Sequence, residues 1–278
     1  TLGHMKNELA QSEHERAPDE RITGECGIMQ RADRLIAPTE TEHKQLVNYY
    51  GANPQKIVVI PPGVDLTRFH AIDKEHARAR VNLPADRRHI VFTGRIEPLK
   101  GIDTLLHAIA LLRKRRPELT DNARVTIIGG DLDEFQRDSE LTRLYELHCA
   151  LNLCGMVGFV GAKEQTVLPY YLAAADMVVM PSLYESFGLV ALEAMAAGTP
   201  VIASRVGGLA HLVQDGVTGF TVPPRDPEAL ASRIEELLSN PDLGAQLGRQ
   251  ASEYARLYEW PAIVQRMVEE VYLPLVCR

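Results

Sequence analysis

The sequence predicts an α/β fold in which a doubly wound parallel sheet is covered by helices on both faces. Three observations support this prediction. From His89 onward, short apolar runs rich in β-branched residues alternate with longer helical segments, which is typical of successive βαβ units. Strands joined in this way pair in parallel and are buried on both faces. Upstream, a single strand and helix precede the connection at Pro61–Gly63, so the last part of a second domain is expected there.

Each strand of the main sheet is predicted from an apolar run, and each helix from the longer segment that follows it. The strand candidates are residues 89–95, 123–130, 156–161, 176–182, 200–204 and 219–224. The helix candidates between them are residues 101–115, 134–152, 167–175, 187–197 and 207–216. Together these elements predict one complete Rossmann-like domain.

Further elements are predicted on both sides of this domain. They are a strand at 33–39, a helix at 41–51 that ends at Gly51, a strand at 56–65 and an amphipathic helix at 260–276. Residues 11–20 are charged and poor in apolar side chains, which predicts a mobile loop.

These patterns divide the chain into three expected parts. Residues 1–62 are expected to be the remnant of an N-terminal domain, and residues 63–259 the Rossmann-like domain. Residues 260–278 are expected to form a helix that crosses back toward the N-terminal part. Because the chain starts with Thr1 and not with methionine, we expect the natural N-terminus to be missing.

Composition argues against several classes of function. The 278 residues have a formal net charge of -7 at pH 7, which argues against a nucleic-acid partner held through its phosphates. The apolar runs are short and interrupted, so neither a transmembrane segment nor a secretory signal peptide is predicted. The four cysteines form no CxxC pair and no zinc spacing. Their spacing favours a reducing, cytoplasmic compartment and predicts no metal site.

Two basic residues follow the first predicted strand of the main sheet. In TGRIEPLKG, residues 93–101, Arg95 and Lys100 lie on a loop before a helix that opens at Gly101. Open α/β sheets bind ligands at this carboxyl edge. Arginine offers a planar fork and lysine a point charge, and beside a helix N-terminus the two suit a diphosphate. The alternative is that both are solvated loop charges.

A carboxylate interrupts an apolar run in YESFGLVALEAMAAG, residues 184–198. The run from Phe187 to Ala197 is apolar apart from Glu193, and burying an unpaired carboxylate costs several kcal/mol, roughly. Glu185 lies before the predicted helix and Glu193 roughly 8 Å further along its axis, so an elongated ligand that crosses the helix start could contact both. Carboxylates accept hydrogen bonds from sugar hydroxyls. The alternatives for Glu193 are a structural Arg or Lys partner, or exposure to solvent.

The start of the same helix offers an anion-binding geometry between the two carboxylates. The amides of Gly188, Leu189 and Val190 have no partner within the helix. A diphosphate at these amides, with sugar hydroxyls on either side, would have the layout of a nucleotide sugar. Glycine-rich turns at 129–131 and 206–208 are consistent with close approach of the backbone to a nucleotide.

Together these motifs resemble the retaining glycosyltransferases of the GT-B fold, in particular the sucrose-phosphate synthase-like group of glycosyltransferase family 4. The resemblance rests on the two glutamates separated by seven residues, the GRIEPLKG loop, the APT strand end and VGGLAHLVQDGVTGF. It covers essentially the whole chain and implies a GT-B fold.

The resemblance implies roles for the site residues. Arg95 and Lys100 would bind the diphosphate of the donor together with the backbone from Phe187 to Val190. Glu185 would contact the transferred sugar, and Glu193 would bind the ribose hydroxyls. Glu185, Arg95 and Lys100 are therefore the candidate catalytic residues.

The implied reaction transfers a hexose from a nucleotide sugar to a sugar or sugar-phosphate acceptor, with retention of configuration and without a metal ion or other cofactor. UDP-glucose is the preferred donor because TLGHMKNEL resembles a segment of the sucrose-phosphate synthase group. GDP-mannose, ADP-glucose and UDP-N-acetylglucosamine would use the same contacts.

Some parts of the family pattern are absent or altered. The glycine-rich loop and the active-site histidine of the acceptor-binding domain are missing, and that histidine would come immediately before Thr1. Lys6 and Arg21 are candidate contacts to the acceptor, with ordinary solvated charges as the alternative. Ser186 and His211 depart from residues common in the family, which leaves the sugar and the acceptor open.

Two other functions remain open. The chain could bind a nucleotide sugar and transfer nothing, or it could be a GT-B sugar-nucleotide epimerase. The basic run RKRRP at 113–117 could contact an anionic membrane surface, although a helix C-terminus before a proline stop is the preferred explanation.

Overall fold

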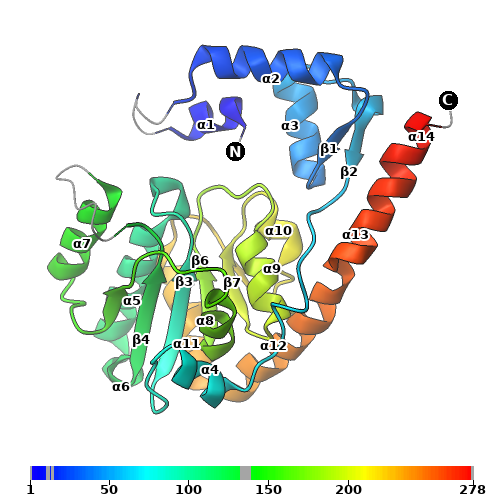
Figure 1. Ribbon diagram of the computed structural model, residues 1–278. Coiled ribbons are helices and arrows are strands. Elements are labelled where there is room, and N and C mark those ends of the chain that lie inside the picture. The colour runs from blue at the N-terminus through cyan, green and yellow to red at the C-terminus, as the bar shows by residue number, and fades with distance from the viewer. Residues whose placement is uncertain (1, 11–12, 14–15, 132–138, 277–278) are drawn as a thin grey trace.

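The structure is a computed structural model that describes residues 2–10, 13, 16–131 and 139–276. Figure 1 shows a large lower part built on a twisted sheet, a small upper part, and a C-terminal helix that runs along one side of both. The start of the predicted helix at 134–152 and part of the predicted loop at 11–20 lie outside the described residues.

The main sheet has six parallel strands in the order β5-β4-β3-β6-β7-β8. The strands are β3 (Arg88–Thr93), β4 (Ala123–Ile128), β5 (Val157–Phe159), β6 (Met177–Met180), β7 (Val201–Ser204) and β8 (Gly219–Val222). Each of them overlaps one of the six predicted apolar runs, so the predicted α/β fold with a parallel sheet is confirmed. The strand order reverses between β3 and β6, and ligands of such sheets bind in the crevice at this point.

Helices cover both faces of this sheet (Figure 1). They are α4 (Lys74–Arg80), α5 (Ile102–Arg115), α6 (Pro117–Asp121), α7 (Glu140–Ala150), α8 (Leu168–Ala174), α9 (Leu189–Ala196), α10 (Leu209–Leu212), α11 (Pro227–Ser239) and α12 (Pro241–Ala255). Successive strand residues point into different cores: Ile90 and Phe92 belong to the core with α5 and α11, whereas Val91 belongs to the core with α8 and α9. Both faces are therefore buried, as the apolar runs predicted.

The upper part contains a second, two-stranded parallel sheet. Its elements are α1 (Gly3–Leu9), α2 (Asp19–Arg31), β1 (Leu35–Ala37), α3 (Glu40–Tyr50), the short 3-10 helix Pro54–Lys56 and β2 (Ile57–Val59). The loop predicted at 11–20 is wrong for Asp19 and Glu20, because these acidic residues form the first turn of α2, where they favour the positive end of the helix dipole.

The C-terminal helix is continuous but changes its hydrogen-bonding pattern. It comprises α13 (Trp260–Met267), a π-helical segment at Val268–Tyr272, and α14 (Leu273–Val276). Ile263 and Val271 pack on Ile60, just beyond β2, so this helix contacts the chain that leaves the upper part. The three domain boundaries expected from the sequence remain a prediction. Across the described ranges, no helix is both long and apolar enough to cross a membrane.

The N-terminus of α3 supplies a first stability prediction. The Thr39 side chain accepts a hydrogen bond of 3.1 Å from the Glu42 amide, and loss of such a cap costs about 1 kcal/mol. Thr39→Ala is therefore expected to lower the free energy of unfolding by about 1 kcal/mol in urea titrations. Thr166→Ala, at an exposed threonine that caps no helix, is the matched control; an equal loss in both variants would contradict the capping role.

Candidate functional site

Two loops meet where the strand order reverses. The loop after β3 ends at Gly101, and the loop after β6 begins at Pro181. They are joined through their backbones, because the Leu183 amide donates a hydrogen bond of 2.8 Å to the Leu99 carbonyl. A Cβ atom on Gly101 would lie only 2.1 Å from the Pro181 carbonyl oxygen, and Gly101 has a φ of 64°. Glycine meets both requirements, so the two loops are held close together.

This contact pairs one residue from each predicted group. Lys100 Nζ donates a hydrogen bond of 2.6 Å to Glu185 Oε2. The two side chains are only 16% and 19% exposed, so the ion pair is largely shielded from water, and charge-assisted bonds of this length are strong. The sequence predicted both residues for the site, and the structure brings them together.

Arg95 is placed differently from Lys100. Its side chain is 71% exposed and forms an ion pair of 2.7 Å with Glu97 on the same loop. A solvated pair of this kind contributes little to stability, so Arg95 is free to change partner. Its contact with a diphosphate remains a prediction.

The helix α9 begins directly beside this ion pair. Gly188 precedes the helix with a φ of 106°, and within the described part of the chain no side chain caps the helix N-terminus. The amides of Leu189 and Val190 therefore have no side-chain cap. Contact of an anion with them and with the Gly188 amide remains a prediction. Phe187, another predicted binding residue, is buried and its ring lies 5.9 Å from that of Tyr258. The Phe187 side chain therefore packs in the core, and contact of its backbone with a ligand remains a prediction.

Glu193 lies one turn inside α9, on a part of the helix that is largely buried. Burial raises the pKa of the Glu193 carboxyl to about 7, and the positive charge of Arg68 only partly offsets this effect. Among the described residues, no basic side chain forms an ion pair with Glu193, so the structural Arg or Lys partner left open by the sequence is not found at ion-pair distance. The carboxylate retains its capacity to accept hydrogen bonds.

The turn after β7 supports the loop that contains Glu185. The Gly208 amide donates a hydrogen bond of 2.9 Å to the Glu185 carbonyl oxygen. A Cβ atom on Gly207 would lie 1.9 Å from this oxygen, and one on Gly208 would lie 2.3 Å from the Phe187 Cα. Gly207 and Gly208 therefore allow the turn at 206–208 to approach the loop that contains Glu185.

The helix α3 of the upper part contacts the same loop from the other side. Tyr184 donates a hydrogen bond of 3.2 Å to Gln45 Oε1, and Ser186 donates one to the Glu42 carboxylate. Burial raises the pKa of Glu42 despite that bond. Sequence reasoning missed these partners on α3; the nearest signal was that Ser186 departs from the family pattern.

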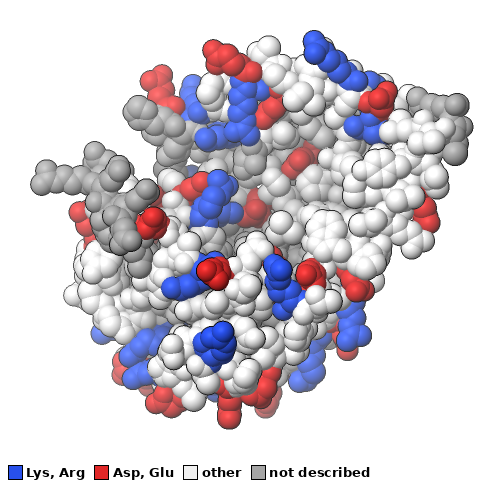
Figure 2. Space-filling view, in the orientation of Figure 1, with Lys and Arg blue, Asp and Glu red and all other residues white. Residues whose placement is uncertain are grey.

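A further contact joins α3 to α10. Thr41 Oγ1 and His211 Nε2 share a hydrogen bond of 3.2 Å. His211 is the second position at which the sequence departs from the family pattern, so both departures contact α3. On the face shown in Figure 2, basic and acidic side chains are interspersed and form no large patch of one charge.

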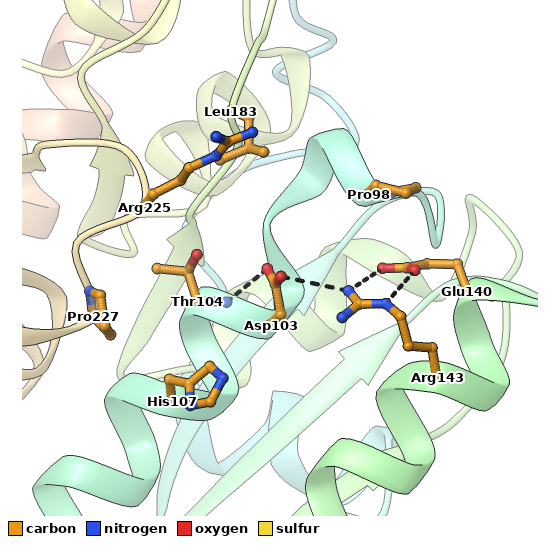
Figure 3. Close-up of a pocket in the computed structure, with 9 residues that line it drawn as sticks. All are labelled: Pro98, Asp103, Thr104, His107, Glu140, Arg143, Leu183, Arg225 and Pro227. Carbon is orange, nitrogen blue, oxygen red and sulfur yellow. Dashed lines mark hydrogen bonds and ion pairs between the residues drawn. The ribbon is translucent and has the colours of Figure 1, made fainter. Parts of the chain in front are cut away.

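A cavity of about 470 Å³ lies beside the two loops, at the N-terminal ends of α5, α7 and α11. Figure 3 shows the residues that line it: Pro98, Asp103, Thr104, His107, Glu140, Arg143, Leu183, Arg225 and Pro227. On its wall, Arg143 is ion-paired with Glu140 at 2.7 Å and with Asp103 at 3.4 Å. None of the predicted donor-binding residues lines this cavity, so we place the candidate donor site at the loops and not in the cavity.

The other basic residues predicted as ligand or membrane contacts lie on helices, and some of them form ion pairs with glutamates. Lys6 lies on α1, and Arg21 on α2 forms an ion pair of 2.9 Å with Glu25. Their contact with an acceptor remains a prediction. The basic run at 113–117 spans the C-terminal end of α5, as preferred, and Arg116 pairs with Glu235 at 2.7 Å.

Comparisons with models of protein families show to which family the chain belongs. The model of the glycosyl transferases group 1 matches residues 73–256, which is more than half of the chain. The chain belongs to this family. The model of glycosyltransferase family 4 matches residues 8–68 of this group 1 glycosyl transferase. The family predicted from the loops and the two glutamates is therefore confirmed.

Curated relatives are similar over most of the chain. D-inositol 3-phosphate glycosyltransferase 2 of Catenulispora acidiphila is 43% identical over 94% of this chain and 61% of its own length. The D-inositol 3-phosphate glycosyltransferase of Streptomyces scabiei is 42% identical over 94% of this chain and 58% of its own length. The group 1 glycosyl transferase described here thus spans about 60% of the length of these relatives.

Solved structures confirm the GT-B fold. Sucrose-phosphate synthase from Thermosynechococcus elongatus is 34% identical with a TM-score of 0.86, over 100% of this chain and 67% of that one. Anabaena HepE, solved with UDP and glucose, has a TM-score of 0.80 at 24% identity, over 91% of this chain and 67% of its own. HepE supports the fold alone.

Proposed function

We propose that this chain supplies the donor-binding half of a retaining glycosyltransferase, which transfers a hexose from a nucleotide-diphosphate sugar to a sugar or sugar-phosphate acceptor. The observation that supports this best is the shielded Lys100–Glu185 pair beside the uncapped start of α9. A cation, free amides and a carboxylate at one crevice match a ligand that has a diphosphate next to a sugar.

Donor binding would exchange the partners of this pair. Lys100 would turn from Glu185 to the diphosphate, and the freed Glu185 carboxylate would accept hydrogen bonds from the hydroxyls of the transferred sugar. Glu193 forms no ion pair within the described residues. It would accept hydrogen bonds from the ribose hydroxyls on the other side of the diphosphate. When the donor binds, Lys100 and Glu185 would lose each other as partners, and each would gain a partner on the donor.

Catalysis in the intact enzyme would be electrostatic and positional. As the bond between the sugar and the diphosphate breaks, negative charge grows on the leaving group, and preorganised donors at Lys100 and the α9 amides would stabilise it. These groups would do so without a metal ion. The acceptor would attack from the face that the diphosphate leaves, which gives retention of configuration.

The donor we favour is UDP-glucose, and the acceptor a phosphorylated sugar or cyclic polyol. The choice of UDP-glucose rests on the segments that resemble the sucrose-phosphate synthase group, whose member from Thermosynechococcus elongatus is 34% identical to this chain. The curated relatives are named for transfer to D-inositol 3-phosphate. We expect α3 to face this acceptor, because it lies across the crevice and contacts the Glu185 loop.

Calorimetric titration with UDP, GDP and ADP tests this proposal, first without added metal and then with magnesium. We expect one nucleotide to bind at least tenfold more tightly than the other two, a difference of about 1.4 kcal/mol or more, without magnesium. Failure of all three to bind, or binding that requires magnesium, would contradict the donor site described above.

Activity distinguishes transfer from the alternatives. UDP-glucose is incubated with D-inositol 3-phosphate, and the products are identified by NMR, which reports the anomeric configuration. With the intact enzyme, we expect the α-linked glucoside from the α-configured donor. An altered sugar nucleotide formed without acceptor would indicate an epimerase, and nucleotide binding with no product would indicate a binding module.

A further inference from the structure

Three metal-ligating side chains meet at the edge of the main sheet that lies away from the donor loops. His148 and Cys149 lie in the last turn of α7, and Cys154 lies just before β5. Their ligand atoms are all within 4.8 Å of one another. Because Cys154 precedes a strand whereas the donor loops follow β3 and β6, this cluster lies at the opposite edge of the parallel sheet. It is therefore not part of the donor site.

The spacing of the three side chains suits a tetrahedral metal ion. Cys149 Sγ lies 3.5 Å from Cys154 Sγ and 3.5 Å from His148 Nδ1. Bonds of about 2.3 Å from zinc to sulfur and about 2.0–2.1 Å to nitrogen place neighbouring ligand atoms about 3.5–3.8 Å apart. Two of the three separations are thus already close to those of a bound ion.

The backbone holds the two thiols in this arrangement. Leu153 is fully buried, and its amide donates a hydrogen bond of 3.0 Å to the His148 carbonyl. Asn152 has a φ of 56°, and its amide bonds the Cys149 carbonyl at 2.9 Å. This left-handed residue turns the chain so that Cys154 returns to Cys149. The sequence predicted no metal site because it contains no CxxC pair, whereas four residues separate Cys149 from Cys154.

The histidine can supply its nitrogen at little cost. The His148 ring is buried against Tyr145 and Phe159, with ring centroids 5.0 and 5.8 Å away, so its orientation is fixed. Its Nδ1 atom lies 3.0 Å from the Tyr145 carbonyl. A metal ion would take the place of the Nδ1 proton. The Tyr145 carbonyl would still accept the intrahelical hydrogen bond of Cys149 in α7.

We propose that His148, Cys149 and Cys154 bind one soft or borderline transition-metal cation of the zinc type. The ion would bind two thiolates and one imidazole and release the two thiol protons, leaving a fourth position for water. Thiolate and imidazole ligands favour such ions over magnesium and calcium. Both cysteines are exposed, so the ion can enter from solvent, and once bound it would clip the end of α7 to the start of β5.

Titration with cobalt(II), a spectroscopic substitute for zinc, tests the proposal in the presence of a reductant that contains no thiol. We expect one equivalent to bind with a thiolate-to-cobalt charge-transfer band, and zinc but not magnesium to displace it. Cys149→Ser and Cys154→Ser each keep one thiolate, so each is expected to weaken the band and to lower the affinity at least tenfold, and the double variant is expected to lose the band. Cys26→Ser, which changes a cysteine outside the cluster, is the matched control and should bind as the parent does.

Other outcomes would overturn the site. Equal cobalt binding by the parent and by the Cys149→Ser/Cys154→Ser double variant would place the ion elsewhere. A parent chain that binds no cobalt, and whose two thiols close to a disulfide with oxidised glutathione, would have a redox pair and no metal site. His148→Gln should keep the charge-transfer band but bind at least tenfold more weakly; unchanged affinity in a folded variant would remove His148 from the proposed ligands.

Discussion

Replacing Lys100 with alanine is expected to weaken nucleoside diphosphate binding at least tenfold, or about 1.4 kcal/mol. Hydrogen bonds to charged groups contribute about 1.5–3 kcal/mol, and the variant loses those of Lys100 to the diphosphate. It also leaves the Glu185 carboxylate, which is only 19% exposed, without its partner at 2.6 Å. An unpaired negative charge beside the diphosphate repels it, so both effects lower the affinity.

Calorimetry with the preferred nucleotide measures this loss. Lys114→Ala is the matched control, because Lys114 is an exposed lysine at the far end of α5, the helix that follows Lys100. A Lys100→Ala variant with the dissociation constant of the parent would remove Lys100 from the donor site.

A double variant separates the two causes. Glu185→Gln removes the repelling charge, so Lys100→Ala/Glu185→Gln is expected to bind the nucleotide more tightly than Lys100→Ala alone. Residues in direct contact are not additive in such cycles, and the difference measures their coupling. If the two substitutions were strictly additive, the Lys100–Glu185 pair would have no part in shaping the unliganded site.

The sequence predicted the sheet well because its strands are local signals. An apolar, β-branched run such as residues 123–128 is recognisable without knowledge of its neighbours, and it forms β4. The helices α11 and α12 were not predicted, although each has a local signal. Asp226 and Asn240 are N-caps followed by a proline at the first helical position, which is a common start for a helix.

The composition of the site was predicted more fully than its contacts. Lys100 and Glu185 were predicted from separate motifs, but their ion pair depends on β3 and β6 being neighbours, and a βαβ pattern does not determine strand order. The same limit applies to Tyr184 and Gln45, which are far apart in the sequence and meet only in the folded chain. Arg95 forms an ion pair with Glu97 and is exposed. The spacing of residues in the sequence does not predict this pair.

Glu193→Gln is expected to stabilise the unliganded protein while it weakens nucleotide binding. The folded-state pKa of Glu193 is about 7, above its ordinary value of 4.5, because burial disfavours the charged form. The folded protein therefore binds more protons than the unfolded chain between these values, so the contribution of Glu193 to stability falls as pH rises from 4.5 to 7. At pH 8 the carboxylate is charged in both states, and the variant should recover about 3 kcal/mol.

The affinity for the nucleotide should rise with pH, whereas the contribution of Glu193 to stability falls. Ribose hydroxyls donate to the ionised carboxylate, so the affinity of the parent for its nucleotide is expected to rise about tenfold between pH 6 and pH 8, as Glu193 loses its proton. Glutamine has no charge to gain, so the variant should bind about tenfold more weakly at pH 8 and show a flatter pH dependence.

Urea titrations and calorimetry at pH 6 and pH 8 test both halves, with Glu146→Gln as the control at an exposed glutamate on α7. A variant that is less stable than the parent at pH 8 would mean that Glu193 has a structural partner. A variant that is more stable but binds the nucleotide as tightly as the parent would mean that the ribose lies elsewhere. Only gained stability together with lost affinity agrees with a Glu193 carboxylate whose burial lowers the folding stability and which binds the ribose.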